Sequence, residues 1–408
     1  MLRRTKISLI ALAVVLLAGC NGIDPPFTGT YEHVFIYCGL GYNNLSGNLR
    51  ANLEDMQSDV LPGLWQDKAV VAFCHNTLNG SYTTPNPPCL IRLYRGTDGK
   101  PVADTLKVYD NMSVSASKES LRTALDDIRG MFPAKHYGML FSSHGSGWVP
   151  GQYTSSAENG LTLARARKPA VPWPETKAVG NQYIGSSKNT QWIELQDFAY
   201  AIPMKVDYLI LDNCLSGCVE LVYELKDLCD YLVVSPTEIL TTGMIYDRLV
   251  RLLMGGNQPD LKAYCEAFYD FYNEKTGTLR SGTITLVDCS KLEALAEAFR
   301  AVLDAHRNAL RPELIGTVQR YYYPSSNLRF YYDLRDLAVQ LGATGAEMTA
   351  LDAALEACVL YHAETPSFFD LELERCCGLS IYIPEPSRTQ LNSQYKTLSW
   401  NNRVHLVQ

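Results

Sequence analysis

Two short motifs place a general base and a thiol directly after apolar segments. Ser143-His144-Gly145 follows the apolar run at residues 137–141, and Asp212-Asn213-Cys214 follows the run at 208–211. An imidazole in contact with a thiol can hold the sulfur as a thiolate, the form that attacks carbonyl carbons. The backbone N–H groups of Gly145 and Cys214 would then form an oxyanion hole. The pair predicts acyl-transfer chemistry if the fold brings the two motifs together.

Short apolar segments alternate with helical segments around these motifs. Strands are predicted at residues 34–37, 69–74, 137–141, 208–211 and 231–234, with helices at 45–60, 121–131, 194–201 and 218–228. This alternation predicts an α/β fold with a mostly parallel sheet and helices on both faces. Ligands of such sheets bind at the carboxyl ends of the strands, so His144 and Cys214 are expected at one edge.

The remaining elements complete a large first domain and a smaller C-terminal part. Residues 89–95 and 106–109 predict a hairpin at a sheet edge, and 282–287 predict a further strand. Ser290 and Glu293 have the spacing of a capping box for the helix that follows. The last hundred residues are more helical but return to a strand at 379–383. We therefore expect one domain over 31–310 and a helical subdomain with a strand over 311–408, packed on the same body.

The N-terminus has the layout of an export signal. Arg3, Arg4 and Lys6 precede an apolar run at residues 9–17, which is too short for a stable membrane span. The Leu-Ala-Gly-Cys ending at Cys20 resembles the bacterial lipobox, which implies removal of residues 1–19, acylation of Cys20 and a lipidated tether over 20–30. The predicted location is the bacterial cell envelope, facing the periplasm or the surface. The alternative is an ordinary signal peptide that ends in cysteine by chance.

Composition restricts the class of partner. The chain has a formal net charge of −7, and removal of residues 1–19 would change it to −10 because three basic residues and no acidic ones are lost. There is no Lys/Arg-rich run, so no nucleic-acid partner is predicted. No later apolar stretch is long enough to span a bilayer, so the predicted membrane contact is through the N-terminal lipid only.

The twelve cysteines invite both a disulfide and a metal interpretation. Cys38, Cys74 and Cys289 lie in strand-like apolar runs, where cysteine behaves as a small hydrophobic residue, so we predict few disulfides. Cys214 and Cys218 are four residues apart, but zinc needs three or four protein ligands and no histidine has suitable spacing nearby. We therefore predict no metal. A Cys214–Cys218 disulfide, which would silence the nucleophile, is not excluded by the sequence.

The order of these motifs resembles the clostripain-like cysteine peptidases, a family that shares its fold with caspases, legumain and gingipains. The resemblance extends over most of the chain after residue 30. It rests on His144-Gly145, on Asp212-x-Cys214 and on several further landmarks. These landmarks are Ile36-Tyr37, Asn43-Asn44-Leu45 with Tyr42 in place of an acidic residue, Ser235 to Glu238, Gly243, Tyr246, residues 330–337 and residues 378–382.

The resemblance implies a caspase-like fold and a cysteine endopeptidase with a His144–Cys214 dyad. It also implies a peptide or protein substrate with Arg or Lys before the scissile bond, bound by acidic residues of the S1 pocket. Asp212 is one matching carboxylate, with Ser235 and Glu238 as further substrate-binding candidates. Thr241 and Thr242 stand where a second acidic residue is expected. The alternatives are that Asp212 caps the following helix and that Glu238 faces solvent.

The stretch from residue 146 to 191 is far longer than an ordinary connection. It displays basic residues at Arg165, Arg167, Lys168, Lys177 and Lys188. Several members of the family mature by cleavage between the two catalytic residues, so these five positions are candidate self-cleavage sites. The alternative is an insertion with a small hairpin of its own, in which residues 182–184 form one strand.

A second class of function is a catalytically silent caspase-fold lipoprotein that binds protein or glycan. The presence of both His144 and Cys214 favours the enzyme over this binding module. No cofactor is predicted. Some relatives use calcium, but the sequence has no dense Asp/Asn/Glu loop with the spacing of calcium ligands.

Overall fold

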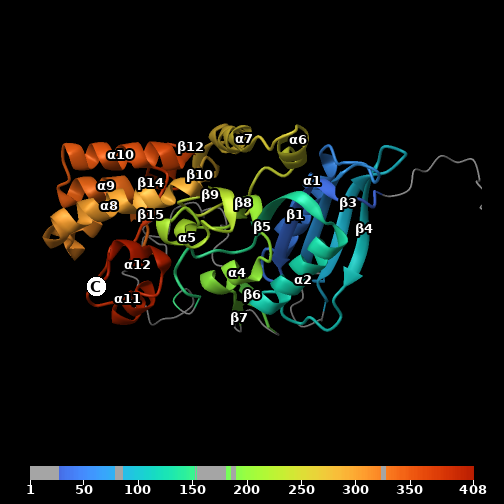
Figure 1. The fold of residues 1–408 in the computed structure, drawn as a ribbon, viewed down its shortest axis with the longest axis horizontal. Coiled ribbons are helices and arrows are strands. Elements are labelled where there is room, and N and C mark those ends of the chain that lie inside the picture. The colour runs from blue at the N-terminus through green and yellow to red at the C-terminus, as the bar shows by residue number, and fades with distance from the viewer. Residues whose placement is uncertain (1–26, 79–85, 152, 154–180, 185–189, 323–327) are drawn as a thin grey trace, which may run out of the picture.

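The computed structural model describes residues 27–78, 86–151, 153, 181–184, 190–322 and 328–408. Its centre is a nine-stranded sheet with the order β12-β10-β9-β8-β5-β1-β2-β3-β4 (Figure 1). The five central strands run parallel to one another. They are β1 (Tyr31–Gly41), β2 (Lys68–Asn76), β5 (Ala134–Ser142), β8 (Val206–Asp212) and β9 (Cys229–Val234). The predicted mostly parallel sheet is therefore confirmed.

The central strands are buried on both faces, which explains their continuous apolar sequences. In β1 every residue except Glu32 is buried, and in β8 every residue except Asp207. A parallel sheet covered by helices on both sides requires apolar side chains at odd and even positions alike. The parallel pairing of β1, β5 and β8 also brings their carboxyl ends to one edge.

Antiparallel strands extend the sheet on both sides. The predicted hairpin is confirmed as β3 (Cys89–Arg95) and β4 (Pro101–Val108), although its second strand begins five residues earlier than expected. The opposite side carries β10 (Thr283–Asp288) and β12 (Val359–Glu364). Since β12 belongs to the C-terminal part of the chain, residues beyond 310 add a strand to the same sheet as β1.

Helices cover both faces of the sheet, as Figure 1 shows. One face carries α1 (Ser46–Ser58), α6 (Leu249–Met254) and α7 (Leu261–Asn273). The other face carries α2 (Lys118–Met131), α4 (Leu195–Ala201) and α5 (Val219–Glu224). An ion pair joins the first group, because Arg251 Nε of α6 lies 2.7 Å from Oδ1 of the fully buried Asp59, which follows α1.

Among its described residues, the chain after β10 contains five α-helices and two short strand pairs. The helices are α8 (Leu292–His306), α9 (Leu334–Leu341), α10 (Ala346–Cys358), α11 (Thr389–Tyr395) and α12 (Ser399–Val404). The strand pairs are β11 (Tyr332–Asp333) with β15 (Ser380–Ile381), and β13 (Ser367–Phe368) with β14 (Leu371–Glu372). The predicted strand at 379–383 is thus reduced to β15.

The predicted capping box before α8 is wrong. Ser290 lies in a 3₁₀ turn, where its backbone N–H and its hydroxyl both donate to Asp288. Glu293 instead accepts a hydrogen bond from the Tyr223 hydroxyl, at 2.6 Å. A nearer acceptor at Asp288 therefore replaces Glu293 as the partner of this turn.

Two further expectations concern the whole molecule. None of the eleven cysteines in the described part of the chain forms a disulfide bond, so Cys214 and Cys218 are not joined. Among the described residues, no helix combines the length and apolar character that a membrane span requires. Cys20 and the rest of the predicted export signal lie outside the described residues.

Candidate active site

His144 follows β5 in a turn at the carboxyl edge of the sheet. Its side chain is buried, and its Nε2 lies 2.8 Å from Oδ1 of Asn44, which follows the neighbouring strand β1. An amide oxygen only accepts, so this contact places the proton of the neutral imidazole on Nε2 and leaves Nδ1 as the basic atom. The Tyr183 hydroxyl donates to the same oxygen at 3.1 Å. Asn44 therefore orients the candidate base, a contact that sequence reasoning did not assign to it.

The position of Asn44 is fixed by its neighbour. Asn43 is fully buried, and its side-chain oxygen accepts the N–H of Leu45 at 2.8 Å while its amide donates to the Leu40 carbonyl. This is an Asx turn, which lets a short polar side chain replace missing backbone partners. The Asn43-Asn44 pair thus turns the chain out of β1 with Asn44 directed at His144.

Cys214 follows β8 two residues after the strand ends. Its side chain is fully buried. Its Sγ accepts the backbone N–H of Ile239 at 3.2 Å and lies 3.7 Å from the Ile239 carbonyl oxygen. The next residue, Leu215, has φ +61°, a strained conformation for a residue with a branched side chain. The cysteine thus sits in a sharp turn beneath the segment that contains Ile239.

Two glycines allow the turn at residues 144–147 (the histidine turn) to approach the turn at residues 213–217 (the cysteine turn). A Cβ at Gly145 would lie 2.7 Å from the Asn213 Cβ and 2.9 Å from the Cys214 carbonyl oxygen. At Gly147, where φ is +57°, it would lie 2.6 Å from the Leu215 carbonyl oxygen. These distances are too short for real Cβ contacts, so glycine is needed at both positions. The two motifs therefore meet at one edge of the sheet, as predicted.

Residues near the C-terminus form hydrogen bonds to the cysteine turn and to the helix that follows it. Ser380 of β15 donates its N–H to the Gly217 carbonyl at 2.8 Å. Glu220 of α5 is fully buried, and its Oε1 accepts the Tyr382 N–H at 2.9 Å and the Tyr395 hydroxyl at 2.7 Å. Burial raises the pKa of Glu220 to about 7. These contacts make residues near the C-terminus part of the scaffold that holds Cys214.

Asp212 is the first substrate-binding candidate, and it lies on the face of the sheet that α6 and α7 cover. It is fully buried and accepts the Ser142 hydroxyl at 2.7 Å and the Tyr246 hydroxyl. Burial and the nearby Asp212 carboxylate raise the pKa of Tyr246 and Tyr264 well above the usual tyrosine value. The alternative that Asp212 caps the following helix is wrong, because α5 begins only at Val219 and has Cys218 as its N-cap.

The other two candidates belong to the segment after β9. Ser235 is fully buried, and its hydroxyl lies 2.8 Å from that of Thr283. Its carbonyl accepts the Gly217 N–H at 2.8 Å, which ties the segment to the cysteine turn. Glu238 is only 4% exposed, so the alternative that it faces solvent is wrong. Both residues belong to the segment from Ser235 to Ile239, which covers Cys214.

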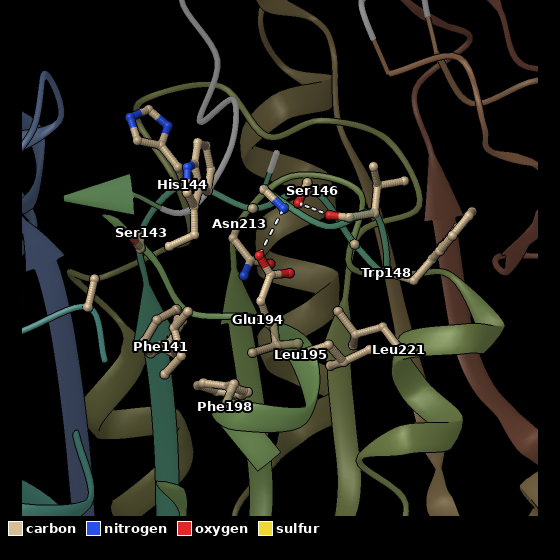
Figure 2. A pocket seen from close by; sticks show the side chains of 18 of the residues that line it. Phe141, Ser143, His144, Ser146, Trp148, Glu194, Leu195, Phe198, Asn213 and Leu221 are labelled. Carbon is tan, nitrogen blue, oxygen red and sulfur yellow. Dashed lines mark hydrogen bonds between the residues drawn. The ribbon is translucent and has the colours of Figure 1, made fainter. Parts of the chain in front are cut away.

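A pocket of about 70 Å³ borders the histidine turn on the face of the sheet that α4 and α5 cover (Figure 2). Its wall contains His144 and Gly145, together with Glu194 at the start of α4. The floor is apolar, and the Phe141 and Phe198 rings lie 4.8 Å apart. Cys214 is not among the residues that line the pocket. The candidate base His144 therefore borders this pocket, whereas the thiol of Cys214 does not.

The long connection between the two motifs is described only in part. A short hairpin joins β6 (Asn181–Tyr183) to β7 (Thr190–Trp192), which confirms the predicted strand at this place. The five candidate self-cleavage residues at 165, 167, 168, 177 and 188 lie outside the described residues. Within the described part, no cluster of His, Cys, Asp or Glu has the arrangement of a metal site.

Comparison with known proteins relates this geometry to a family. The clostripain family model matches residues 172–406, a segment that contains Cys214 and follows His144. No curated protein sequence matches the chain. Among solved structures, an inactive zymogen C11 protease from Parabacteroides distasonis is 24% identical, with a TM-score of 0.73 over 94% of this chain and 99% of its own.

Two structures from Bacteroides thetaiotaomicron are similarly close in fold. A secreted C11 cysteine protease is 24% identical with a TM-score of 0.73, over 93% of this chain and 100% of its own. A secreted C11 cysteine protease in complex with an irreversible peptide inhibitor is 21% identical with a TM-score of 0.72, over 91% and 98%. These similarities confirm the predicted fold, and the family match covers more than half of the sequence. The chain therefore belongs to the clostripain family and is a clostripain-like cysteine peptidase.

Proposed function

We propose that this protein is an exported endopeptidase in which Cys214 is the nucleophile and His144 the general base. The observation that carries the proposal is the close packing of the Gly145–Gly147 turn on the Asn213–Leu215 turn. This packing brings an oriented imidazole and a cysteine to one edge of a rigid parallel sheet. The peptide inhibitor bound to a similar protease supports a peptide as the substrate class.

The proposed reaction is a two-step acyl transfer. The Nδ1 atom of His144 takes the thiol proton, and the thiolate forms a bond to the carbonyl carbon of the scissile peptide. The N–H groups of Gly145 and Cys214 stabilise the oxyanion, an effect of roughly 3–4 kcal/mol per donor in other acyl-transfer enzymes. The protonated imidazole then gives its proton to the leaving amine as the C–N bond breaks. Water, deprotonated by His144, hydrolyses the thioester.

The burial of the thiol supports a form of this site that is covered before activation. Substrate reaches Sγ only after the segment with Ile239 moves away from it. We propose that cleavage at one of the five basic residues in the 146–191 connection triggers this change. The end of that connection is attached to the base, because Tyr183 bonds to Asn44 and Asn44 bonds to His144. A similar protease was solved as an inactive zymogen.

The proposed specificity is for Arg or Lys before the scissile bond. Asp212 would supply the charge in the uncovered S1 pocket, with Ser235 and Glu238 beside it. A carboxylate forms paired, charge-assisted hydrogen bonds with a guanidinium group, so Arg is expected to be preferred over Lys. Asp212 must first exchange its bonds from Tyr246 and Ser142 for bonds to the substrate.

The test of the proposed function is peptide hydrolysis by single and double variants. We expect Cys214→Ala and His144→Ala each to lower kcat/KM by about 10³-fold or more while the protein stays folded. The double variant should be no worse than either single variant, because nucleophile and base act as one unit. Hydrolysis by Cys214→Ala at a rate near that of the wild type would contradict the proposal.

We also propose that acylated Cys20 anchors the enzyme in the bacterial cell envelope. The proposal rests on the Leu-Ala-Gly-Cys sequence after a basic and apolar leader. Cys20→Ser should leave unprocessed precursor or release the protein from the membrane fraction. Unchanged processing and unchanged membrane partition in Cys20→Ser would contradict the anchor.

A further inference from the structure

The pocket beside His144 contains a carboxylate without a cationic partner among the described residues. Glu194 is exposed, and its Oε1 accepts the backbone N–H of Gly151 at 3.1 Å. Desolvation of the carboxyl group by the pocket wall raises the pKa of Glu194, as does the nearby Asp197, and the Gly151 N–H partly offsets this effect. One backbone N–H leaves further acceptor sites of this carboxylate open, and a cation seated in the pocket can bind there through a charge-assisted hydrogen bond.

A second polar group of the same pocket is buried and unsatisfied. Asn213 is only 8% exposed, and its side-chain oxygen has no hydrogen-bond partner in the described structure. Both Asn213 and Glu194 line the pocket, and Figure 2 draws their polar ends in its centre. The unsatisfied amide oxygen of Asn213 and the carboxylate of Glu194 together predict a ligand that donates several hydrogen bonds and has a positive charge.

The remainder of the pocket suits the carbon chain of such a ligand. Figure 2 shows Phe141, Leu195, Phe198 and Leu221 around the base of Glu194, with His144 at the rim. The volume of about 70 Å³ is roughly that of five water positions, enough for a short aliphatic chain. Lysine side chains pack their methylene groups on apolar surface while the charged end reaches a polar partner.

We propose that this pocket is a subsite for a basic side chain of the peptide substrate, recognised by Glu194 and Asn213. The subsite lies across the sheet from Asp212, because α4 and α5 form it whereas α6 and α7 cover Asp212. It therefore reads a residue of the peptide other than the one before the scissile bond. The proposal deepens the proposed function and rests on it.

The test compares lysine with norleucine, which has the same chain length and no amine, at each peptide position in turn. The residue before the scissile bond is held constant. We expect one position at which the wild type prefers lysine by about tenfold or more in kcat/KM. Glu194→Gln keeps an acceptor for the Gly151 N–H, and it should lower this ratio to near one. Glu119→Gln is the matched control, since Glu119 is an exposed carboxylate of α2 that does not line the pocket, and the ratio should not change.

Two further measurements keep the test decisive. Glu194→Asp retains the charge on a shorter side chain, so part of the lysine preference should survive in it even if Glu194→Gln does not fold. Peptide affinity measured on the cleaved wild type after alkylation of Cys214 gives the same ratio without turnover, which separates this subsite from the proposed chemistry. A lysine preference at no position, or one that persists unchanged in folded Glu194→Gln, would overturn the subsite.

Discussion

The two turns that carry the candidate dyad are held in opposite ways. The histidine turn borders a pocket, and its imidazole is held from outside by the exposed Asn44. The cysteine turn is buried and is held from inside by the Ile239 backbone, by Ser380 and by the helix that contains Glu220. The comparison fits the proposal that the base is already positioned and that activation removes the cover over the thiol.

The two carboxylates beside the dyad differ in the same sense. Asp212 is fully buried and has two hydroxyl partners, whereas Glu194 lines a pocket with one backbone donor. Asp212 belongs to a recognisable motif, but Glu194 is the residue whose carboxylate lines a pocket that a ligand can enter. A motif position therefore does not by itself identify which charge a ligand meets.

The largest expected effect concerns removal of the cover. Purified wild-type protein should appear as two associated fragments, and Cys214→Ala as one intact chain. Replacing the five candidate cleavage residues by glutamine should also give one chain and should lower activity strongly, because the thiol stays buried. Sodium dodecyl sulfate electrophoresis and peptide hydrolysis check both statements. A single wild-type chain with full activity would show that the connection is no activation switch.

Asn44→Ala should lower kcat by roughly 10–100-fold, because the imidazole loses the acceptor that fixes its orientation. Asn44→Asp keeps an acceptor and should recover much of this loss. Its pH profile should move to higher pH, since a carboxylate stabilises the imidazolium. Asn48→Ala, which replaces a half-buried asparagine of α1, is the matched control. Equal activity of Asn44→Ala and Asn48→Ala would show that Asn44 has no part in positioning His144.

Asp212→Asn should lower hydrolysis of arginine substrates by about tenfold relative to leucine substrates, because a hydrogen bond to a charged group is lost. Tyr246→Phe removes the phenol that donates to Asp212 and should change the ratio in the opposite direction. Equal losses on both substrates in Asp212→Asn would assign Asp212 a structural role. Thermal unfolding of both variants separates loss of the fold from loss of specificity.

The smallest effect concerns the support of the cysteine turn, and it depends on pH. The pKa of buried Glu220 is about 7 in the folded protein, above the ordinary value of 4.5, so the folded state binds one proton more between these values. Stability therefore falls as pH rises from about 4.5 to 7. The groups around Glu220 are Cys218, Tyr331, Tyr382 and Tyr395, which stay neutral in this range.

Glu220→Gln keeps acceptors for Tyr382 and Tyr395 but carries no charge. We expect it to raise the free energy of unfolding by roughly 1–3 kcal/mol at pH 8 and to change it little at pH 4. Chemical denaturation at the two pH values checks this difference. Equal effects of the substitution at both values would contradict a protonated Glu220 in the folded state.

The sequence predicted the elements that position the site better than the contacts within it. Continuous apolar strands and the amphipathic α2 helix could be recognised because burial imposes a periodic pattern. The Asn44–His144 contact joins residues 100 positions apart, and the pocket that contains Glu194 is lined by residues from Leu40 to Leu221, so neither leaves a periodic signal. The failed capping box at Ser290 shows a further limit, because Asp288, two residues earlier, was the stronger local acceptor.

The motif also could not predict that Cys214 is buried. Asp212-Asn213-Cys214 indicates where the thiol is in the chain but contains no information about the segment from Ser235 to Ile239 that covers it. That cover depends on Leu215 and Gly217 donating to the carbonyls of Thr237 and Ser235. Such backbone pairing between turns is set by the sheet order and not by residue type.

In the proposed mechanism, Cys214 is a nucleophile that His144 activates and that stays covered until the connection between the two residues is cut. The most direct measurement is labelling of the intact protein with a thiol-reactive peptide electrophile, followed by mass spectrometry of the modified cysteine. We expect rapid modification of Cys214 in the cleaved wild type, and slow modification in His144→Ala and in the uncleaved form. Rapid labelling of Cys214 in His144→Ala, or a cleaved wild type in which Cys214 stays unlabelled, would contradict the claim.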